Sequence, residues 1–362
     1  MQLFIFGAQA IALETAAALR TLDSSVPLLG FLVTSLEGNP VQLCGLPVLD
    51  IERFRREYGA QLDDILVLIA TPENVQARIE EMLENVGIRH HQQLTSRRWA
   101  ELMELYHARL GQFQLLRALP VGVRMPFVRA FCMRSEHDTP LQHSCDLPEW
   151  IIPIQVGAAG SSLRVSALRD DTGENISQKN GNYCELTGLY WVWRNRLMEV
   201  AEPETERQQY YGLFQYRRML ALTDEDLLRM VDGNIDVILP WPMLYEPDVS
   251  VHHKRYIKPV DWQALERALS ELAADYVDDL AKVMRQQFFY NYNILLARRS
   301  VLRDYCSWLF PLLERIEELS RPKGGERHDR YIGYMAESLE TLYFMANKAK
   351  LKIVHVGCRF LV

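Results

Sequence analysis

The sequence has no apolar run that approaches the roughly 18 to 20 residues needed to cross a bilayer. Its opening residues have the pattern of a β-strand, without the basic stretch, apolar core and cleavage site of a secretory leader. Both absences predict a cytoplasmic protein. Any membrane contact would then be peripheral, at the inner membrane face.

The chain also lacks an excess of positive charge and any paired cysteine motif. It has 40 Lys and Arg against 47 Asp and Glu, a formal net charge of −7, which argues against a nucleic-acid partner. The six cysteines show no CxxC pair and no metal-ligand spacing, so we expect reduced, mostly buried thiols and no disulfide framework. They are Cys44, Cys132, Cys145, Cys184, Cys306 and Cys358.

With 362 residues the chain is long enough for two domains. The apolar residues 3–6 end at Gly7, and residues 8–19 then have helical spacing. Further strands are expected at residues 28–33 and 65–70. This alternation predicts an N-terminal Rossmann-like parallel sheet in residues 1–95, a helical linker in 96–121 and a second domain in 122–362.

The first turn of the N-terminal domain carries an incomplete nucleotide fingerprint. Where GxGxxG is expected, residues 7–12 read GAQAIA, so Gly7, Ala8 and Gln9 are weak candidates for nucleotide contacts. A purely structural turn is the alternative. With residues 30–32 (GFL) and 44–49 (CGLPVL), this segment resembles the small N-terminal domain of bacterial sugar acyltransferases, which implies a sugar nucleotide rather than NAD.

The second domain alternates strands with helices, which predicts an α/β fold. Helical spacing at residues 96–119 ends before Pro120 and Pro126. Strands are expected at residues 127–133, 235–240, 288–296 and 352–356, and helices at 183–195, 261–287, 305–319 with a break or kink at Pro311, and 329–347.

Five motifs in residues 122–362 occur in a recognisable order. They are DTGENIS at 171–177 with Asn180, YCELTGLYW at 183–191, YRR at 216–218, Tyr292-Asn293, and Arg330 with Gly333 and Glu337. Together they resemble a bacterial capsular and exopolysaccharide glycosyltransferase family known as a domain of unknown function. The resemblance implies a GT-A-like fold that transfers a sugar from a nucleotide donor. The family leads us to expect His before Tyr-Arg-Arg, where this chain has Gln215.

Arg217 and Arg218 follow a short apolar strand, so they would lie at the edge of the sheet where ligands bind. A guanidinium can donate two hydrogen bonds to phosphate oxygens. No Asp-x-Asp pair follows this strand, and we therefore hypothesise that the two arginines replace a metal ion at the leaving diphosphate. The alternative is that one arginine pairs with a buried carboxylate such as Glu185.

Several polar residues are candidates for donor binding, each with a structural alternative. Asp171, or Asp170 with it, could bind ribose hydroxyls or a Mn²⁺ or Mg²⁺ ion, or form a turn that caps the next helix. Asn175, Ser177 and Asn180 suit sugar hydroxyls and backbone caps equally well. The family motifs add four residues to this donor-binding set: Glu185, Tyr216, Asn293 and Arg330.

Glu337 is a candidate general base, on a helix that begins near Arg330. A helix salt bridge, with Arg330 or a lysine near Lys348, is the alternative.

The predicted function is hexosyl transfer from a nucleoside diphosphate sugar to a capsular, exopolysaccharide or lipid-linked glycan acceptor, with no firmly implied cofactor. A homo-oligomer is compatible with the sequence. The rival hypotheses are a non-catalytic sugar-nucleotide-binding scaffold and an NAD-dependent oxidoreductase.

Overall fold

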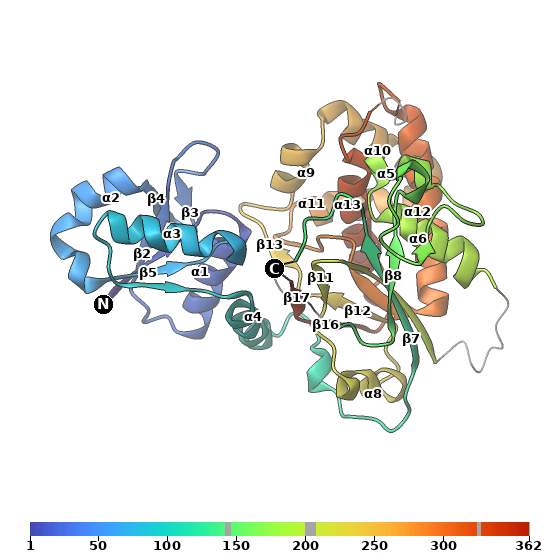
Figure 1. Ribbon diagram of the computed structural model, residues 1–362, viewed down its shortest axis with the longest axis horizontal. Coiled ribbons are helices and arrows are strands. Elements are labelled where there is room, and N and C mark those ends of the chain that lie inside the picture. The colour runs from blue at the N-terminus through green and yellow to red at the C-terminus, as the bar shows by residue number, and fades with distance from the viewer. Residues whose placement is uncertain (142–145, 200–207, 324–326, 362) are drawn as a thin grey trace. The chain divides into compact units, whose positions relative to one another are not determined.

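The computed structural model describes residues 1–141, 146–199, 208–323 and 327–361 (Figure 1). The described chain forms two compact units. The first contains Met1–Phe113 and Met243–Glu246, and the second Gln114–Pro242 and Pro247–Leu361. Both are built on largely parallel sheets with helices, so the α/β prediction is confirmed. No helix in the described part of the chain is long and apolar enough to cross a membrane.

The first unit contains a six-stranded sheet in the order β3-β4-β2-β1-β5-β6. All neighbouring pairs are parallel except β3 with β4. The chain leaves β1 for β2 on one side and later returns to β5 on the other, which makes the end of β1 a topological switch point. The strands are β1 (Gln2–Phe6), β2 (Leu28–Val33), β3 (Gln42–Leu43), β4 (Leu46–Asp50), β5 (Ile65–Ile69) and β6 (His91–Gln93), and β13 (Met243–Leu244) lies in the later segment.

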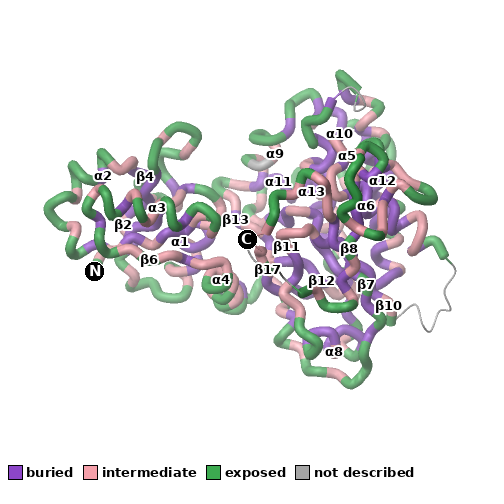
Figure 2. The backbone as a smooth tube through the Cα atoms, in the orientation of Figure 1, coloured by how far each residue is buried: buried purple, intermediate pink, exposed green. Residues whose placement is uncertain are grey.

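Apolar strands and amphipathic helices build the core of the first unit. Phe4 and Phe6 of β1 pack with Phe54 and Leu83, which two of the helices contribute. Figure 2 shows that β2 is largely buried while most of α2 is exposed. The helices are α1 (Ala10–Leu22), α2 (Ile51–Tyr58), η1 (Gly59–Asp64), α3 (Glu73–Asn85) and α4 (Ser96–Leu110).

Helix α4 is shorter than the sequence pattern predicts. It ends at Leu110 because Gly111 adopts a left-handed conformation (φ 64°) and closes the helix, as glycine commonly does. The expected continuation to residue 119 is therefore wrong, and only a short 3₁₀ turn, η2 (Leu116–Ala118), follows.

The second unit is built on a larger sheet in the order β16-β12-β15-β10-β7-β8-β9. Strands β7, β8, β9 and β10 run parallel, while β15 is antiparallel to β10 and β12. The strands are β7 (Phe127–Arg134), β8 (Ile151–Gln155), β9 (Leu168–Arg169), β10 (Gln209–Gln215), β11 (Arg218–Leu220), β12 (Val237–Pro240), β14 (Phe288–Phe289), β15 (Leu295–Arg298), β16 (Ile353–Val356) and β17 (Cys358–Phe360).

Helices cover this sheet, with α12 packed against both α10 and α13. The expected helix over 261–287 is interrupted near Ala273, whereas α12 continues through Pro311 as one helix. The helices are η3 (Ala158–Gly160), η4 (Ser177–Lys179), α5 (Asn180–Tyr183), α6 (Leu186–Val192), η5 (Trp193–Leu197), α8 (Asp224–Asp232), α9 (Ser250–Tyr256), α10 (Pro259–Leu272), η6 (Ala274–Tyr276), α11 (Val277–Met284), α12 (Arg299–Leu319) and α13 (Tyr331–Ala346).

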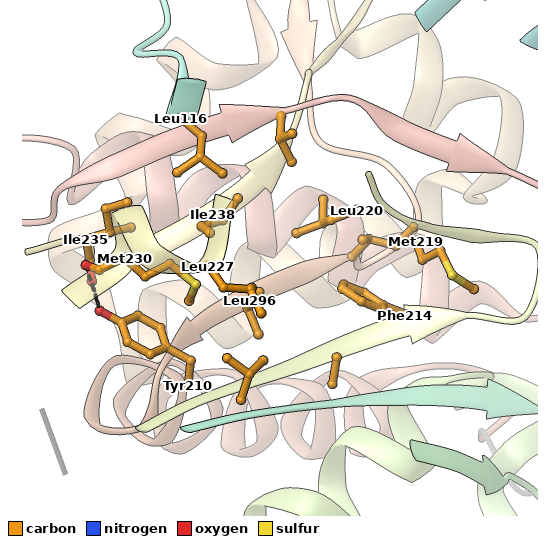
Figure 3. Packing of buried hydrophobic residues seen from close by; sticks show 14 of the residues in the cluster. Leu116, Tyr210, Phe214, Met219, Leu220, Leu227, Met230, Ile235, Ile238 and Leu296 are labelled. Carbon is orange, nitrogen blue, oxygen red and sulfur yellow. Dashed lines mark hydrogen bonds between the residues drawn. The ribbon is translucent and has the colours of Figure 1, made fainter. Parts of the chain in front are cut away.

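A cluster of buried apolar side chains packs against one face of this sheet (Figure 3). Tyr210 at the start of β10 is fully buried there, and its hydroxyl donates a 2.8 Å hydrogen bond to the carbonyl of Ile235. This bond satisfies the one polar atom that the ring would otherwise bury without a partner. The five described cysteines are free thiols, and Cys145 lies outside the described residues.

Candidate active site

The carboxyl ends of the parallel strands place polar groups from distant parts of the sequence on one edge of the second sheet. Strand β10 ends at Gln215, and Arg217 and Arg218 follow directly. The antiparallel β15 starts at the same edge, so Tyr292 and Asn293 enter it from the preceding loop. Polar groups gathered at such an edge are typical of ligand sites in α/β proteins.

The segment between α5 and α6 carries a strained residue. Cys184 adopts φ 51° and ψ −130°, a conformation that non-glycine residues rarely adopt. The side-chain amide of Asn180 stabilises it by donating hydrogen bonds to the Cys184 carbonyl (2.7 Å) and to Oγ1 of Thr187 (3.1 Å). This break in the predicted helix over 183–195 turns Glu185 toward the sheet edge.

The Glu185 carboxylate is held by two amides. Nδ2 of Asn293 donates to its Oε1 at 2.8 Å, and Nε2 of Gln215 donates to the same oxygen at 3.3 Å. Burial raises the pKa of Glu185, the nearby Glu337 carboxylate adds to this rise, and the Asn293 hydrogen bond and Arg330 oppose it. A carboxyl with a raised pKa in a polar site is well suited to accept a proton.

The loop before β15 is a left-handed turn, whereas the sequence predicted strand throughout residues 288–296. Tyr292 (φ 74°) and Asn293 (φ 51°) both have positive φ, and the backbone N–H of Tyr292 donates to Oε1 of Glu337 at 2.8 Å. With Cys184 and Arg330, four of the six positive-φ residues other than glycine in the described chain belong to this site. Such strain persists only where the surrounding structure enforces it, and it clusters at functional sites.

Arg330 precedes α13 in a left-handed conformation (φ 63°) and its Nε donates to Sγ of Cys184 at 3.2 Å. Burial raises the pKa of Cys184 to about 12, so the sulfur stays a neutral thiol at physiological pH. Gly333 permits the close approach of α13, because a Cβ at this position would lie 3.3 Å from that sulfur.

A third carboxyl lies behind the site. Glu340, one turn after Glu337 on α13, is fully buried, and neither of its oxygens has a hydrogen-bond partner within the described structure. Burial, together with the neighbouring Glu337 and Glu185, raises its pKa well above the usual range. Burial without a hydrogen-bond partner therefore disfavours the charged form of Glu340.

Arg217 and Arg218 follow Gln215 at the same edge of the sheet and form no salt bridge to any described residue. Arg218 donates to Oε1 of Gln215 at 3.2 Å and lies 4.1 Å from the centre of the Tyr292 ring. Arg217 donates to the carbonyl of Thr139 at 3.4 Å and lies over the Tyr216 ring. The side-chain amides of Gln215 and Asn293 bind the Glu185 carboxyl, for which the alternative interpretation expected an arginine as partner.

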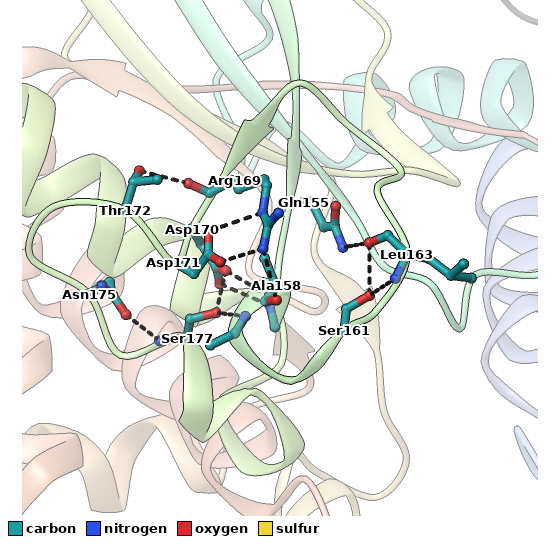
Figure 4. A network of polar contacts seen from close by, with 12 residues as sticks. Gln155, Ala158, Ser161, Leu163, Arg169, Asp170, Asp171, Thr172, Asn175 and Ser177 are labelled. Atoms are coloured by element: carbon teal, nitrogen blue, oxygen red, sulfur yellow. Dashed lines mark hydrogen bonds and ion pairs between the residues drawn. The ribbon is translucent and has the colours of Figure 1, made fainter.

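The predicted donor-binding residues at 170–177 form a hydrogen-bonded network of their own (Figure 4). Asp170 is fully buried and accepts hydrogen bonds from the N–H groups of Gly157 (2.9 Å) and Ala158 (3.1 Å) and from the Ser177 hydroxyl (2.5 Å). These hydrogen bonds connect the residues that follow β8 with the loop after β9.

Asp171 and Asn175 also have protein partners in this network. Asp171 pairs with Arg169 at 2.5 Å, and Oδ1 of Asn175 accepts from the N–H of Ser177 at 3.2 Å as a local cap. No cluster of three His, Cys, Asp or Glu residues suited to a metal ion occurs in the part of the chain that the structure describes.

In the first unit, Gly7, Ala8 and Gln9 lie at the switch point after β1. Gly7 has φ 125°, and a Cβ there would lie 2.8 Å from the carbonyl oxygen of Ala70, so this position requires glycine. Nε2 of Gln9 donates to Oδ1 of Asn39 at 2.9 Å.

Sequence reasoning missed the role of Gln215 and the presence of Glu340. The departure from the expected His was the one sequence signal for Gln215. A glutamate on the buried stripe of an otherwise apolar helix was the signal for Glu340.

Comparison with known proteins gives one family and one fold. The family model described as domain of unknown function DUF4422 matches residues 141–348, more than half of the chain. The apo structure of WbbM, a bifunctional glycosyltransferase, is similar in fold, with a TM-score of 0.52 and 24% identity. The match covers 65% of this chain and 45% of that one, so this chain spans less than half of WbbM's length. No curated protein sequence matches.

Proposed function

The chain belongs to the DUF4422 family, and we propose that it is a glycosyltransferase that moves a hexose from a nucleoside diphosphate sugar to a glycan or lipid-linked glycan acceptor. Residues 122–362 form the transferase module in this proposal. The observation that carries it is the pair Arg217 and Arg218, two guanidinium groups free of salt bridges within the described structure, at the sheet edge where Gln215 contacts both Arg218 and the Glu185 carboxyl.

The arginines meet the electrostatic demand of the reaction. Cleavage of the glycosidic bond leaves charge on the departing diphosphate, and preorganised cations stabilise that charge. The Nε atoms of Arg217 and Arg218 and Oδ1 of Asn293 are buried without partners among the described residues. Buried polar atoms are normally satisfied, so these three atoms support a bound polar ligand at this edge.

The reaction also needs a base, because the acceptor hydroxyl must lose a proton as it attacks, and the carboxyls can accept that proton. The proton acceptor is Glu337, as the sequence predicts, or its neighbour Glu185, whose pKa is raised by burial. Asn180, Tyr216 and Arg330 are donor-site residues in the same proposal.

The N-terminal module is a separate part of the proposal. We assign a sugar nucleotide to the turn of Gly7, Ala8 and Gln9, on the acyltransferase-like pattern of about the first 75 residues and the position of the turn at a topological switch point. Gln9→Ala would weaken that binding and leave transfer by the second unit unchanged.

Isothermal titration of nucleoside diphosphates and their sugars, with and without Mg²⁺ or Mn²⁺, tests the arginine site. Arg217→Ala and Arg218→Ala should each weaken donor binding roughly 10- to 100-fold, the effect of losing a charge-assisted hydrogen bond. Arg129→Ala is the matched control, an exposed arginine in β7 that lies over the Phe127 ring. Binding that requires a metal and ignores both substitutions would contradict the proposal. Binding without transfer or hydrolysis would favour the scaffold hypothesis.

A further inference from the structure

The side-chain amide of Gln215 uses both its donor and its acceptor atoms inside the candidate site. Its Nε2 donates to the Tyr292 carbonyl at 2.7 Å and to Oε1 of Glu185 at 3.3 Å. Its Oε1 accepts from the Arg218 guanidinium at 3.2 Å. One neutral side chain therefore contacts a carboxylate, a cation and a strained turn.

These contacts tie together three segments that are far apart in the sequence. Gln215 ends β10, Glu185 precedes α6, and Tyr292 belongs to the loop before β15. Arg218 lies over the ring of the same Tyr292, at 4.1 Å from its centre. A shift of the Gln215 side chain would move the carboxylate and the guanidinium together.

We propose that Gln215 is a positioning residue, which holds the Glu185 carboxylate as proton acceptor and the Arg218 guanidinium as diphosphate ligand in one hydrogen-bonded unit. The inference rests on the proposed function and refines it. It assigns the base to Glu185, while Glu337 supports the turn through the N–H of Tyr292.

The chemistry of an amide explains the choice of residue. Gln donates and accepts at once and carries no charge at any pH. A carboxylate at this position could still accept from Arg218, but it would lose both donated hydrogen bonds and would repel Glu185. The other ionisable groups that face Glu185 are Cys184, Arg330, Glu337 and Glu340, and a substitution at 215 leaves all of them in place.

Gln215→Glu is the decisive substitution because it keeps the shape of the side chain. The apparent pKa on the acid side of the pH dependence of kcat should rise by about one unit, because two neighbouring carboxylates shift each other's pKa by at least that much. The donor KM should rise roughly tenfold because the new carboxylate competes with phosphate for Arg218. Gln209→Glu is the matched control. It makes the same change at the other end of β10, where Oε1 of Gln209 accepts from Arg299, and it should leave both quantities unchanged.

A stability measurement tests the same contact without activity. Thermal unfolding of wild type, Gln215→Glu, Glu185→Gln and the double variant at pH 5 and pH 8 forms a double-mutant cycle. Gln215→Glu should lower the melting temperature more at pH 8 than at pH 5, and this difference should vanish in the Glu185→Gln background.

The outcomes separate this inference from the proposed function. An active wild type, with Gln215→Glu identical to Gln209→Glu in pH profile and donor KM and with no coupling to Glu185→Gln in the unfolding cycle, would overturn the inference alone. A wild type that neither binds nor turns over a nucleotide sugar would overturn the proposed function, and the positioning role with it.

Discussion

The backbone N–H of Tyr292 donates a 2.8 Å hydrogen bond to Oε1 of Glu337. The residue that the sequence marks as a general base thus also stabilises a left-handed turn at the edge of the sheet. Removing the Glu337 side chain would take this hydrogen bond away from the turn.

Substitutions of Glu337 can separate these two roles. Glu337→Gln keeps an acceptor oxygen for the N–H of Tyr292, so we expect unfolding free energy within about 1 kcal/mol of wild type, whereas Glu337→Ala should cost about 1 to 3 kcal/mol. Urea unfolding measures both values. If Glu337 is the base, Glu337→Gln binds donor but loses transfer. If Glu185 is the base, Glu185→Gln loses transfer and Glu337→Gln keeps a substantial part of it.

Asp170 should behave as a structural residue. Asp170→Asn replaces one acceptor oxygen with a donor that faces the N–H of either Gly157 or Ala158, so we expect a loss of about 3 kcal/mol in urea unfolding. Asp171→Asn, the neighbouring control, breaks a less buried ion pair and should cost under about 1 kcal/mol. Stabilisation of wild type by Mg²⁺ that disappears in Asp170→Asn would instead indicate a cation site.

Glu14 should make the first unit less stable as pH rises. Its side chain is buried, Oε1 accepts from the N–H of Leu244 at 2.8 Å, and burial raises its pKa to about 8. The unfolded chain releases this proton near pH 4.5, so the stability that the protonated form contributes is lost as pH rises from about 4.5 to 8. The full difference corresponds to at most roughly 5 kcal/mol.

Glu14→Gln provides the test, because it keeps the acceptor for Leu244 and cannot ionise. The melting temperature of wild type should fall relative to Glu14→Gln between pH 5 and pH 8, followed by circular dichroism. Parallel pH curves for the two proteins would show that Glu14 does not titrate in this range.

Gly7→Ala should destabilise the first unit by about 3 kcal/mol or more. The added methyl would meet the Ala70 carbonyl oxygen at 2.8 Å, in a backbone conformation that only glycine adopts easily. Gly38→Ala is a matched control, since Gly38 also has positive φ (72°) but a methyl added there would meet nothing within 4 Å, so about 1 kcal/mol is expected. Hydrogen exchange of β1 and β5 would report the difference, and equal protection in both variants would contradict it.

Local sequence pattern predicted the scaffold better than the site. The apolar run of β10 before Arg217 and Arg218 identified the strand, because side-chain pattern along a strand is a local property, and the ligand site at its end stays a prediction. The contact of Glu185 with Gln215 spans 30 residues and its contact with Asn293 spans 108. Contacts of this kind depend on how the sheet is assembled, which local spacing does not specify.

The failed predictions of secondary structure occur mostly where tertiary contacts override local preference. Helical spacing over 183–195 gave no sign of the break at Cys184, which the Asn180 side chain stabilises from the preceding helix. The aromatic residues near Tyr292 favour a strand by propensity, yet Glu337 on a distant helix holds them in a turn.

The short segment Met243–Glu246 belongs to the first unit although it lies in the middle of the sequence that builds the second. A fragment cut after Phe113 would therefore be missing the strand whose Leu244 amide meets Glu14. The complementary fragment would contain that strand without the unit to which it belongs. A single cut in the chain therefore yields two incomplete fragments. A fragment that contains the first unit alone should include these four residues or replace the Glu14 carboxyl with a neutral group.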